Sequence, residues 1–345
     1  DSNEMKYKTF AKKIKLGNGL RVLLYEMPWA NSVAVQLLVN AGSRYESVNE
    51  YGTAHFLEHM FFEGTRHYPS NRELVKATEA HGGGLNAYTS KDEVSYSAVF
   101  LKDNAAKAIK FLYELVFNPL LKNEAVKKEK GIVAEELKKT IDDPERRIGQ
   151  LVFSNFWQEK SALGHPVLGS EKSIRSMTKD KLAGHIKKFY TPANMLLAIA
   201  GNFNVKSITN TLKDNFGKIP KKVGTPRIAK VKIANSGSRI ATEKRSDMKQ
   251  VHISLSFLNN LTFADKRDPV YAIFRKIIEN EVFDKLIYAL GLAYSAYATR
   301  QLYRDFSIID SGILILEINF LSSIISLTSV SGYILATPGI GLRNV

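Results

Sequence analysis

The start of the chain alternates apolar and polar residues in the manner of β-strands. Residues 13–16 and 20–25 alternate on either side of the Asn18-Gly19 pair, a sequence that favours tight hairpin turns. Residues 32–39 form a third and more apolar run. We therefore predict a hairpin and a neighbouring strand in this region.

The apolar spacing beyond residue 50 changes between the helical period and the strand period. Phe56, Leu57, Met60 and Phe61 follow the spacing of one helical face. Strands that are followed by helices, with few alternating βαβ units, predict the α+β class. We expect further strands at 85–90, 94–101 and 195–201, and further helices at 72–80, 103–117, 122–141, 145–160 and 178–190.

The second half of the chain repeats this pattern weakly. Residues 250–257 read as a strand and residues 269–278 as a helix, which predicts a duplicated α/β-sandwich domain without the histidines of the first. The final forty residues carry almost no charge, and the later helices of this domain are not recognisable, so we expect it to be truncated or altered. The predicted organisation is a first domain at 1–205, a basic linker at 206–240 and a second domain at 241–345.

The candidate chemistry lies in the helix predicted around Phe56. His55 and His59 are four residues apart and share a face, and Glu58 holds a carboxylate beside them. Two imidazoles in this arrangement can bind one zinc ion, and a catalytic zinc uses three protein ligands. Histidines on helices are also common without a metal, so a third ligand has to be found.

The helix predicted at 122–141 offers that ligand. Glu129 and Glu136 are seven residues apart, so they lie two turns along one face, which they share with apolar residues. Glutamates on a lysine-rich helix usually form solvated pairs with lysine, and that explanation suffices for Glu135. Pairing with lysine explains less well why Glu129 and Glu136 share a face with apolar residues.

The His55-x-x-Glu58-His59 motif followed by Glu136 resembles that of the pitrilysin and mitochondrial processing peptidase family of zinc peptidases. The resemblance includes residues 41–46 and 82–92 and extends over roughly residues 10–317. It implies that His55, His59 and Glu136 bind Zn²⁺ and that Glu58 is the general base of a metalloendopeptidase with a zinc-activated water. It also implies that Glu129 assists catalysis as a carboxylate that orients a ligand.

The resemblance also implies how a peptide substrate binds. Asn86, Ala87 and Tyr88 correspond to an edge strand that pairs with the substrate backbone, although an ordinary edge strand protected by a lysine remains the simpler alternative. Tyr294 corresponds to a tyrosine that acts with an arginine seven residues earlier, and that position is Ile287 here. We therefore expect a homodimer, or a heterodimer with a related subunit that supplies the Arg/Tyr pair.

The composition narrows the class of protein. The 345 residues include no cysteine, so any metal is held by nitrogen and oxygen. The net charge of +15 raises the alternative of a basic protein that binds RNA or anionic surfaces. The basic run at 206–250 lacks interleaved aromatic residues, so we expect no nucleic-acid partner.

A long uncharged run lies near the end of the chain. The uncharged run from Ile318 to Ala336 has the length of a membrane span, but polar residues such as Asn319 interrupt it, so we expect no stable span. The chain begins at Asp1 rather than Met, which favours a removed leader and a periplasmic or otherwise exported protein.

A structural or assembly subunit of a processing-peptidase-like complex is the alternative to an active peptidase.

Overall fold

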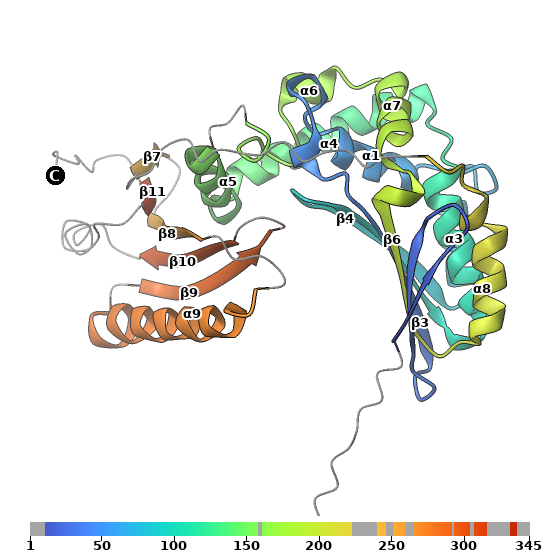
Figure 1. Cartoon of the computed structure of the whole chain (residues 1–345). Helices are drawn as coiled ribbons and strands as arrows, with labels where there is room; N and C mark the ends of the chain where they lie inside the picture. The colour runs from blue at the N-terminus through green and yellow to red at the C-terminus, as the bar shows by residue number, and fades with distance from the viewer. Residues whose placement is uncertain are drawn as a thin grey trace, which may run out of the picture. The chain divides into compact units, whose positions relative to one another are not determined.

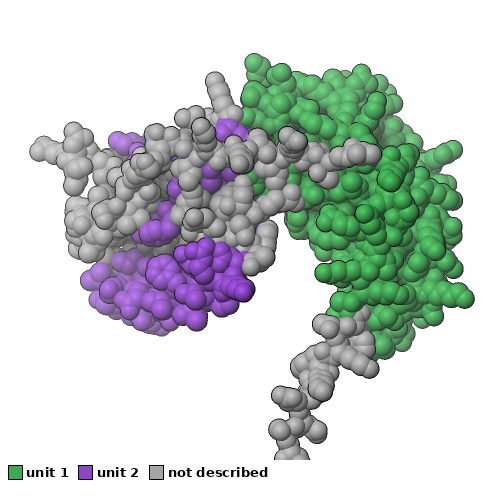
Figure 2. Space-filling view, in the orientation of Figure 1, with its two compact units in different colours: residues 1–135, 166–229 green, residues 136–165, 230–345 purple. Residues whose placement is uncertain are grey.

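The computed structural model describes residues 11–157, 161–222, 240–245, 251–259, 265–291, 293–303, 307–315 and 332–336. The chain divides into two compact units, which Figure 2 shows in two colours. Unit 1 contains residues 1–135 and 166–229, and unit 2 contains residues 136–165 and 230–345.

Unit 1 is built on a mixed six-stranded sheet in the order β1-β2-β6-β3-β5-β4. Neighbouring strands are antiparallel except for β2 and β6, which are parallel. The predicted hairpin is β1 and β2. The strands are β1 (Ala11–Lys15), β2 (Arg21–Glu26), β3 (Ser32–Val39), β4 (Gly83–Thr89), β5 (Val94–Leu101) and β6 (Met195–Gly201).

Helices cover the apolar face of this sheet. In β3, Val33, Val35 and Leu37 alternate with more exposed residues and are 0% exposed, so one face forms the core. Helix α3 packs on β3 and β5, and α8 packs on α3 (Figure 1). The helices are α1 (Thr53–Phe62), α2 (Asn71–Glu79), α3 (Ala105–Phe117), α4 (Asn123–Asp142), which continues into unit 2, α6 (Glu171–Arg175), α7 (Lys179–Phe189) and α8 (Val205–Asp214).

Unit 2 contains a five-stranded sheet in the order β7-β11-β8-β10-β9. Helix α9 packs along β9, and α5 packs against β8 and β11 (Figure 1). Asp143 starts α5 by accepting hydrogen bonds from the amides of Glu145 and Arg146, at 2.9 and 3.2 Å. The elements are α5 (Pro144–Trp157), β7 (Ile240–Lys244), β8 (Val251–Asn259), α9 (Asp268–Phe283), the π-helical η6 (Asp284–Ala289), β9 (Ala293–Leu302), β10 (Ser307–Ile315) and β11 (Gly332–Ala336).

The two sheets share one topology, which confirms the predicted α+β duplication. The order β2-β6-β3-β5-β4 in unit 1 becomes β7-β11-β8-β10-β9 in unit 2, and in each sheet the first of these pairs is the parallel one. By position in the chain, α9 stands where α1 stands, between the second and third strands of the repeat. Helix α9 contains no histidine, so the repeat has lost the metal-binding residues.

The segment predicted as a basic linker differs from the expectation over its first part. Residues 205–214 form α8, whose Ile208 and Leu212 are buried, and α8 packs on α3. The side chain of Asn18 holds the segment that follows α8, because its amide donates hydrogen bonds to the carbonyls of Phe216 (2.7 Å) and Ile219 (3.0 Å). Unit 1 therefore extends past residue 205, because two apolar residues a turn apart give this lysine-containing segment a face that packs.

The expected altered C-terminus and most of the uncharged run from 318 to 336 lie outside the described residues. Within the described ranges, no helix is long and apolar enough to cross a membrane. The described part of that run is β11, which pairs with β7 and β8.

Candidate active site

Helix α1 begins at a position that requires glycine. Gly52 has φ +82°, and a Cβ there would lie 2.4 Å from the carbonyl oxygen of Leu168. The carboxylate of Glu46, a residue that is 5% exposed, accepts hydrogen bonds from the amides of Gly52 (2.8 Å) and Ala54 (2.7 Å). A buried negative charge thus holds the first turn of α1, at the end where the helix dipole favours an anion.

His55 and His59 follow in the first two turns of α1. Their ring centroids are 4.8 Å apart, and His55 is 8% exposed. One ligand atom each from His55, His59 and Glu136 of α4 lie within 4.8 Å of one another. Catalytic zinc sites use three nitrogen or oxygen ligands and keep one position open, so this donor set fits the zinc ion that the sequence predicts.

Glu129 lies on α4 two turns before Glu136, with its side chain 4% exposed. Its Oε2 lies 3.1 Å from Nδ1 of His59. An ionised carboxylate only accepts hydrogen bonds, so the ring hydrogen belongs on Nδ1 and the lone pair on Nε2. Glu129 therefore fixes the orientation and the tautomer in which His59 can bind a metal.

Glu58 is half-buried on α1 and is held by the end of the edge strand. Its Oε2 accepts a hydrogen bond from Oγ1 of Thr89, the last residue of β4, at 2.5 Å. The buried hydroxyls of Tyr96 and Tyr190 lie 2.6 Å apart. Burial, together with the negative charge of Glu58, raises the pKa of both phenols, so both stay neutral next to this carboxylate.

Strand β4 lies at the edge of the sheet, as expected for the segment that contains Asn86, Ala87 and Tyr88. Its side chains alternate, with Asn86 and Tyr88 exposed and Ala87 half-buried. The Oδ1 of Asn86 accepts a hydrogen bond from the amide of Ala87 at 2.9 Å, and the hydroxyl of Tyr88 donates to Glu93 at 3.2 Å. Because β4 ends at Thr89, this strand leads directly to Glu58.

Two predicted positions belong to unit 2. Tyr294 is the second residue of β9, and its side chain is 72% exposed. Ile287 lies in η6 and has no group that could act as a cation. The structure therefore brings together His55 and His59 of α1 with Glu129 and Glu136 of α4, packs β4 against α1, and places Tyr294 on the second sheet.

Sequence reasoning missed two residues that position this site, Glu46 and Thr89. Glu46 belongs to a segment that was recognised only as part of the family resemblance. It lies six residues before Gly52, and its burial exists only in the folded chain, so no local pattern marks it as a cap. Thr89 lies within the strand predicted at 85–90, but it is 31 residues from Glu58 along the chain, and no local pattern joins the two.

Family profiles match both halves of the chain. The profile described as insulinase (peptidase family M16) matches residues 21–171, and the profile described as the peptidase M16 inactive domain matches residues 176–323. The second match agrees with the absence of histidine from α9, the helix that takes the place of α1 in the repeat.

Curated relatives and solved structures also match most of the chain. A protein of Rickettsia felis named an uncharacterized zinc protease is 31% identical over 295 residues, covering 84% of this chain and 70% of the relative. The uncharacterized zinc protease YmxG of Bacillus subtilis is 30% identical over 301 residues, covering 85% and 71%. The crystal structure of a protease from Helicobacter pylori covers 92% of this chain and 78% of its own, with a TM-score of 0.82 and 21% identity, so it supports the fold.

Proposed function

The chain belongs to the insulinase, or M16, family of peptidases, and from this premise we propose that it is a zinc-dependent endopeptidase. Its substrates are extended peptides or unfolded segments of precursor proteins. The observation that carries the proposal is the convergence of His55, His59 and Glu136 within 4.8 Å. A structural or assembly subunit would have no need to keep two histidines, a capped helix and a buried orienting carboxylate together.

The metal chemistry follows from the donor set. His55, His59 and Glu136 would hold the ion, and Glu129 would keep Nε2 of His59 available to it. When bound, a zinc ion supplies Lewis acidity, which polarises a carbonyl group and makes water more acidic. The relatives that are named zinc proteases support zinc as the metal.

Glu58 is proposed as the general base. Its carboxylate takes the proton from the water that attacks the scissile carbonyl carbon and then passes this proton to the leaving amine. The hydrogen bond from Thr89 to Oε2 helps to hold the carboxylate in one orientation. Thr89 thereby acts as a positioning residue for the base.

The substrate is proposed to bind along the free edge of β4. An extended peptide that pairs with Asn86, Ala87 and Tyr88 is held through its main chain, with little demand on its sequence. A peptide at this edge runs toward Thr89 and Glu58, because β4 ends at that hydrogen bond. This geometry favours unfolded segments over folded domains.

A partner subunit is part of the proposal. The family resemblance pairs Tyr294 with an arginine seven residues earlier, and Ile287 cannot replace a guanidinium group. We propose that a second copy or a related chain supplies an Arg/Tyr pair for full activity. Export from the cytoplasm stays a prediction.

Hydrolysis of a quenched fluorescent peptide library tests the activity. The zinc-loaded chain is expected to cleave flexible peptides, to lose this activity after treatment with a chelator, and to regain it when zinc is added back. Activity that rises when a related subunit is added would support the partner proposal. Cleavage that persists in chelator would refute a metal-dependent reaction.

A further inference from the structure

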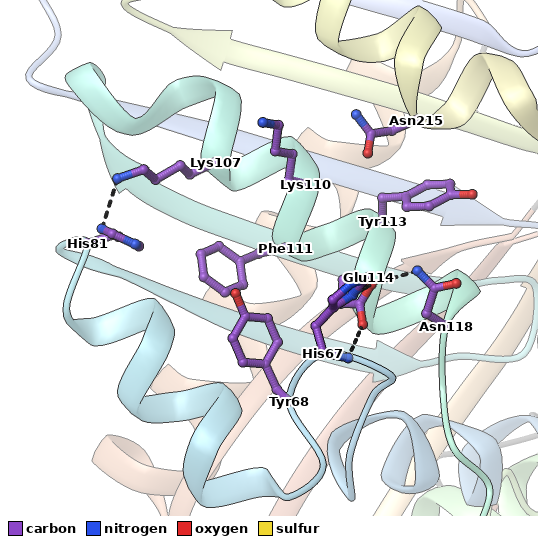
Figure 3. Close-up of a pocket in the computed structure, with 10 residues that line it drawn as sticks. All are labelled: His67, Tyr68, His81, Lys107, Lys110, Phe111, Tyr113, Glu114, Asn118 and Asn215. Carbon is purple, nitrogen blue, oxygen red and sulfur yellow. Dashed lines mark hydrogen bonds and ion pairs between the residues drawn. The ribbon is translucent and has the colours of Figure 1, made fainter.

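Unit 1 contains a pocket of about 480 Å³ on the outer side of α3 (Figure 3). Its walls come from the loop at residues 67–68, His81 just after α2, helix α3 with the following Asn118, and Asn215 just after α8. None of the residues that line it belongs to the candidate zinc site or to β4. Its volume lies within the range of pockets that bind small molecules.

Aromatic rings form the floor of this pocket. Phe111 is 5% exposed, and its ring stacks with that of Tyr68 at a centroid distance of 5.4 Å and with that of Phe100 at 5.5 Å, so the half-buried Tyr68 is the more accessible ring. The imidazole of His81 lies at the edge of this pair, 6.1 Å from Phe111. Figure 3 shows the rings of Phe111 and Tyr68 side by side at the centre of the pocket. A planar apolar group could stack on this surface.

The rim of the pocket is positively charged. Lys107 and Lys110 are exposed, and they lie one turn apart on α3. Nζ of Lys107 lies 3.0 Å from Nδ1 of His81, so this ammonium group is held at the edge of the aromatic floor. Two ammonium groups on one rim attract an anion.

The carboxylate in the pocket wall is already engaged. Glu114 accepts hydrogen bonds from the backbone amide of His67 at 2.8 Å and from the side-chain amide of Asn118 at 2.6 Å. Its Oε2 also lies 3.0 Å from Nδ1 of His67. These hydrogen bonds hold the carboxylate to the loop and to the end of α3.

We propose that this pocket binds an organic anion with an aromatic body. The ring would stack on Tyr68, which Phe111 supports from below, and the oxyanion would contact the ammonium groups of Lys107 and Lys110. Two sources share this chemistry, a free aromatic acid and the carboxyl-terminal aromatic residue of a peptide. The proposal does not depend on the activity at the zinc site.

Isothermal titration with indole-3-acetate tests the site in the full-length chain. The neutral indole-3-acetamide and the non-aromatic acetate serve as matched probes. Indole-3-acetate is expected to bind at least about fivefold more tightly than either, because only it offers both the ring and the charge. Equal binding of the amide, or equal binding of acetate, would overturn the proposal.

Charge-neutral variants locate the binding. Lys107→Gln/Lys110→Gln is expected to weaken binding of indole-3-acetate at least about fivefold. The pair Lys172→Gln/Lys179→Gln makes the same change in net charge at exposed lysines of α6 and α7, and it should leave binding unchanged. An equal loss in both pairs would show a general charge effect and would refute the site.

A peptide experiment separates the two sources. The peptide Gly-Gly-Ser-Gly-Phe and its C-terminal amide are titrated into Glu58→Gln, so that cleavage does not interfere. If the peptide with the free carboxyl terminus binds more tightly than its amide, and if Lys107→Gln/Lys110→Gln removes this difference, a peptide terminus is a ligand. Binding of indole-3-acetate alone would identify a small aromatic acid, and failure of both ligands would reject the proposal.

Discussion

Substitution of Glu129 by glutamine tests how the buried carboxylate supports the metal site. The change keeps the shape of the side chain but removes the negative charge that lies 3.1 Å from Nδ1 of His59. Because the Glu129 side chain is 4% exposed, little water can replace the lost interaction. Such outer partners of metal-binding histidines typically change metal affinity by about 10- to 100-fold, which corresponds to about 1.4 to 2.8 kcal/mol.

The assay is a competition for zinc between the protein and a chromophoric chelator at fixed pH. Glu129→Gln is expected to bind zinc about 10- to 100-fold more weakly than the wild type. Glu63→Gln is the matched control, because Glu63 pairs with the neighbouring Lys128 at 2.9 Å on the exposed side of the same region. It should retain wild-type affinity.

Two results would refute this reasoning. Wild-type zinc affinity in Glu129→Gln would show that His59 is oriented without the carboxylate. An equal loss in Glu63→Gln would show that the effect comes from the general negative charge around Lys128, since that variant leaves the contact with His59 intact.

Three further predictions concern the base, the zinc helix and the pH dependence of stability. Thr89→Val should lower kcat about tenfold with little change in KM or zinc content, and Thr89→Ser should restore it, because serine keeps the hydroxyl that donates to Glu58 and valine lacks it. Gly52→Ala should reduce the free energy of unfolding by about 2 kcal/mol or more in urea titrations, given φ +82° and the close Leu168 carbonyl. Burial lowers the pKa of His185 to about 4, so the folded state disfavours its protonation, and stability should fall as the pH drops from about 6.5 to 4. His185→Leu should reduce this fall in unfolding experiments, and an unchanged pH profile would contradict the assignment.

The local parts of the fold could be predicted from the sequence. The alternation of residues 32–39 predicts strand β3, and the helical spacing around Phe56 predicts helix α1. The position of the two histidines on one face follows from the helix period. The two-turn separation of Glu129 and Glu136 places both on one face of a helix, and the family resemblance then selects Glu136 as the ligand.

Contacts between distant segments could not be predicted in the same way. Thr89 meets Glu58 only because β4 and α1 are packed together. Helix α8 was hidden because its lysines suggested a solvated linker, whereas two apolar residues suffice for it to pack on α3. The pocket on α3 is lined from several separate segments, so it exists only in the folded chain.

The central claim is tested most directly by measuring zinc content and peptide cleavage on the same preparations of Glu58→Gln and His55→Ala. We expect Glu58→Gln to hold one equivalent of zinc, like the wild type, and to cleave no peptide. His55→Ala should lose both properties, because it removes a ligand. Normal cleavage by Glu58→Gln would contradict the assigned base, and full zinc binding by His55→Ala would contradict the assigned ligands.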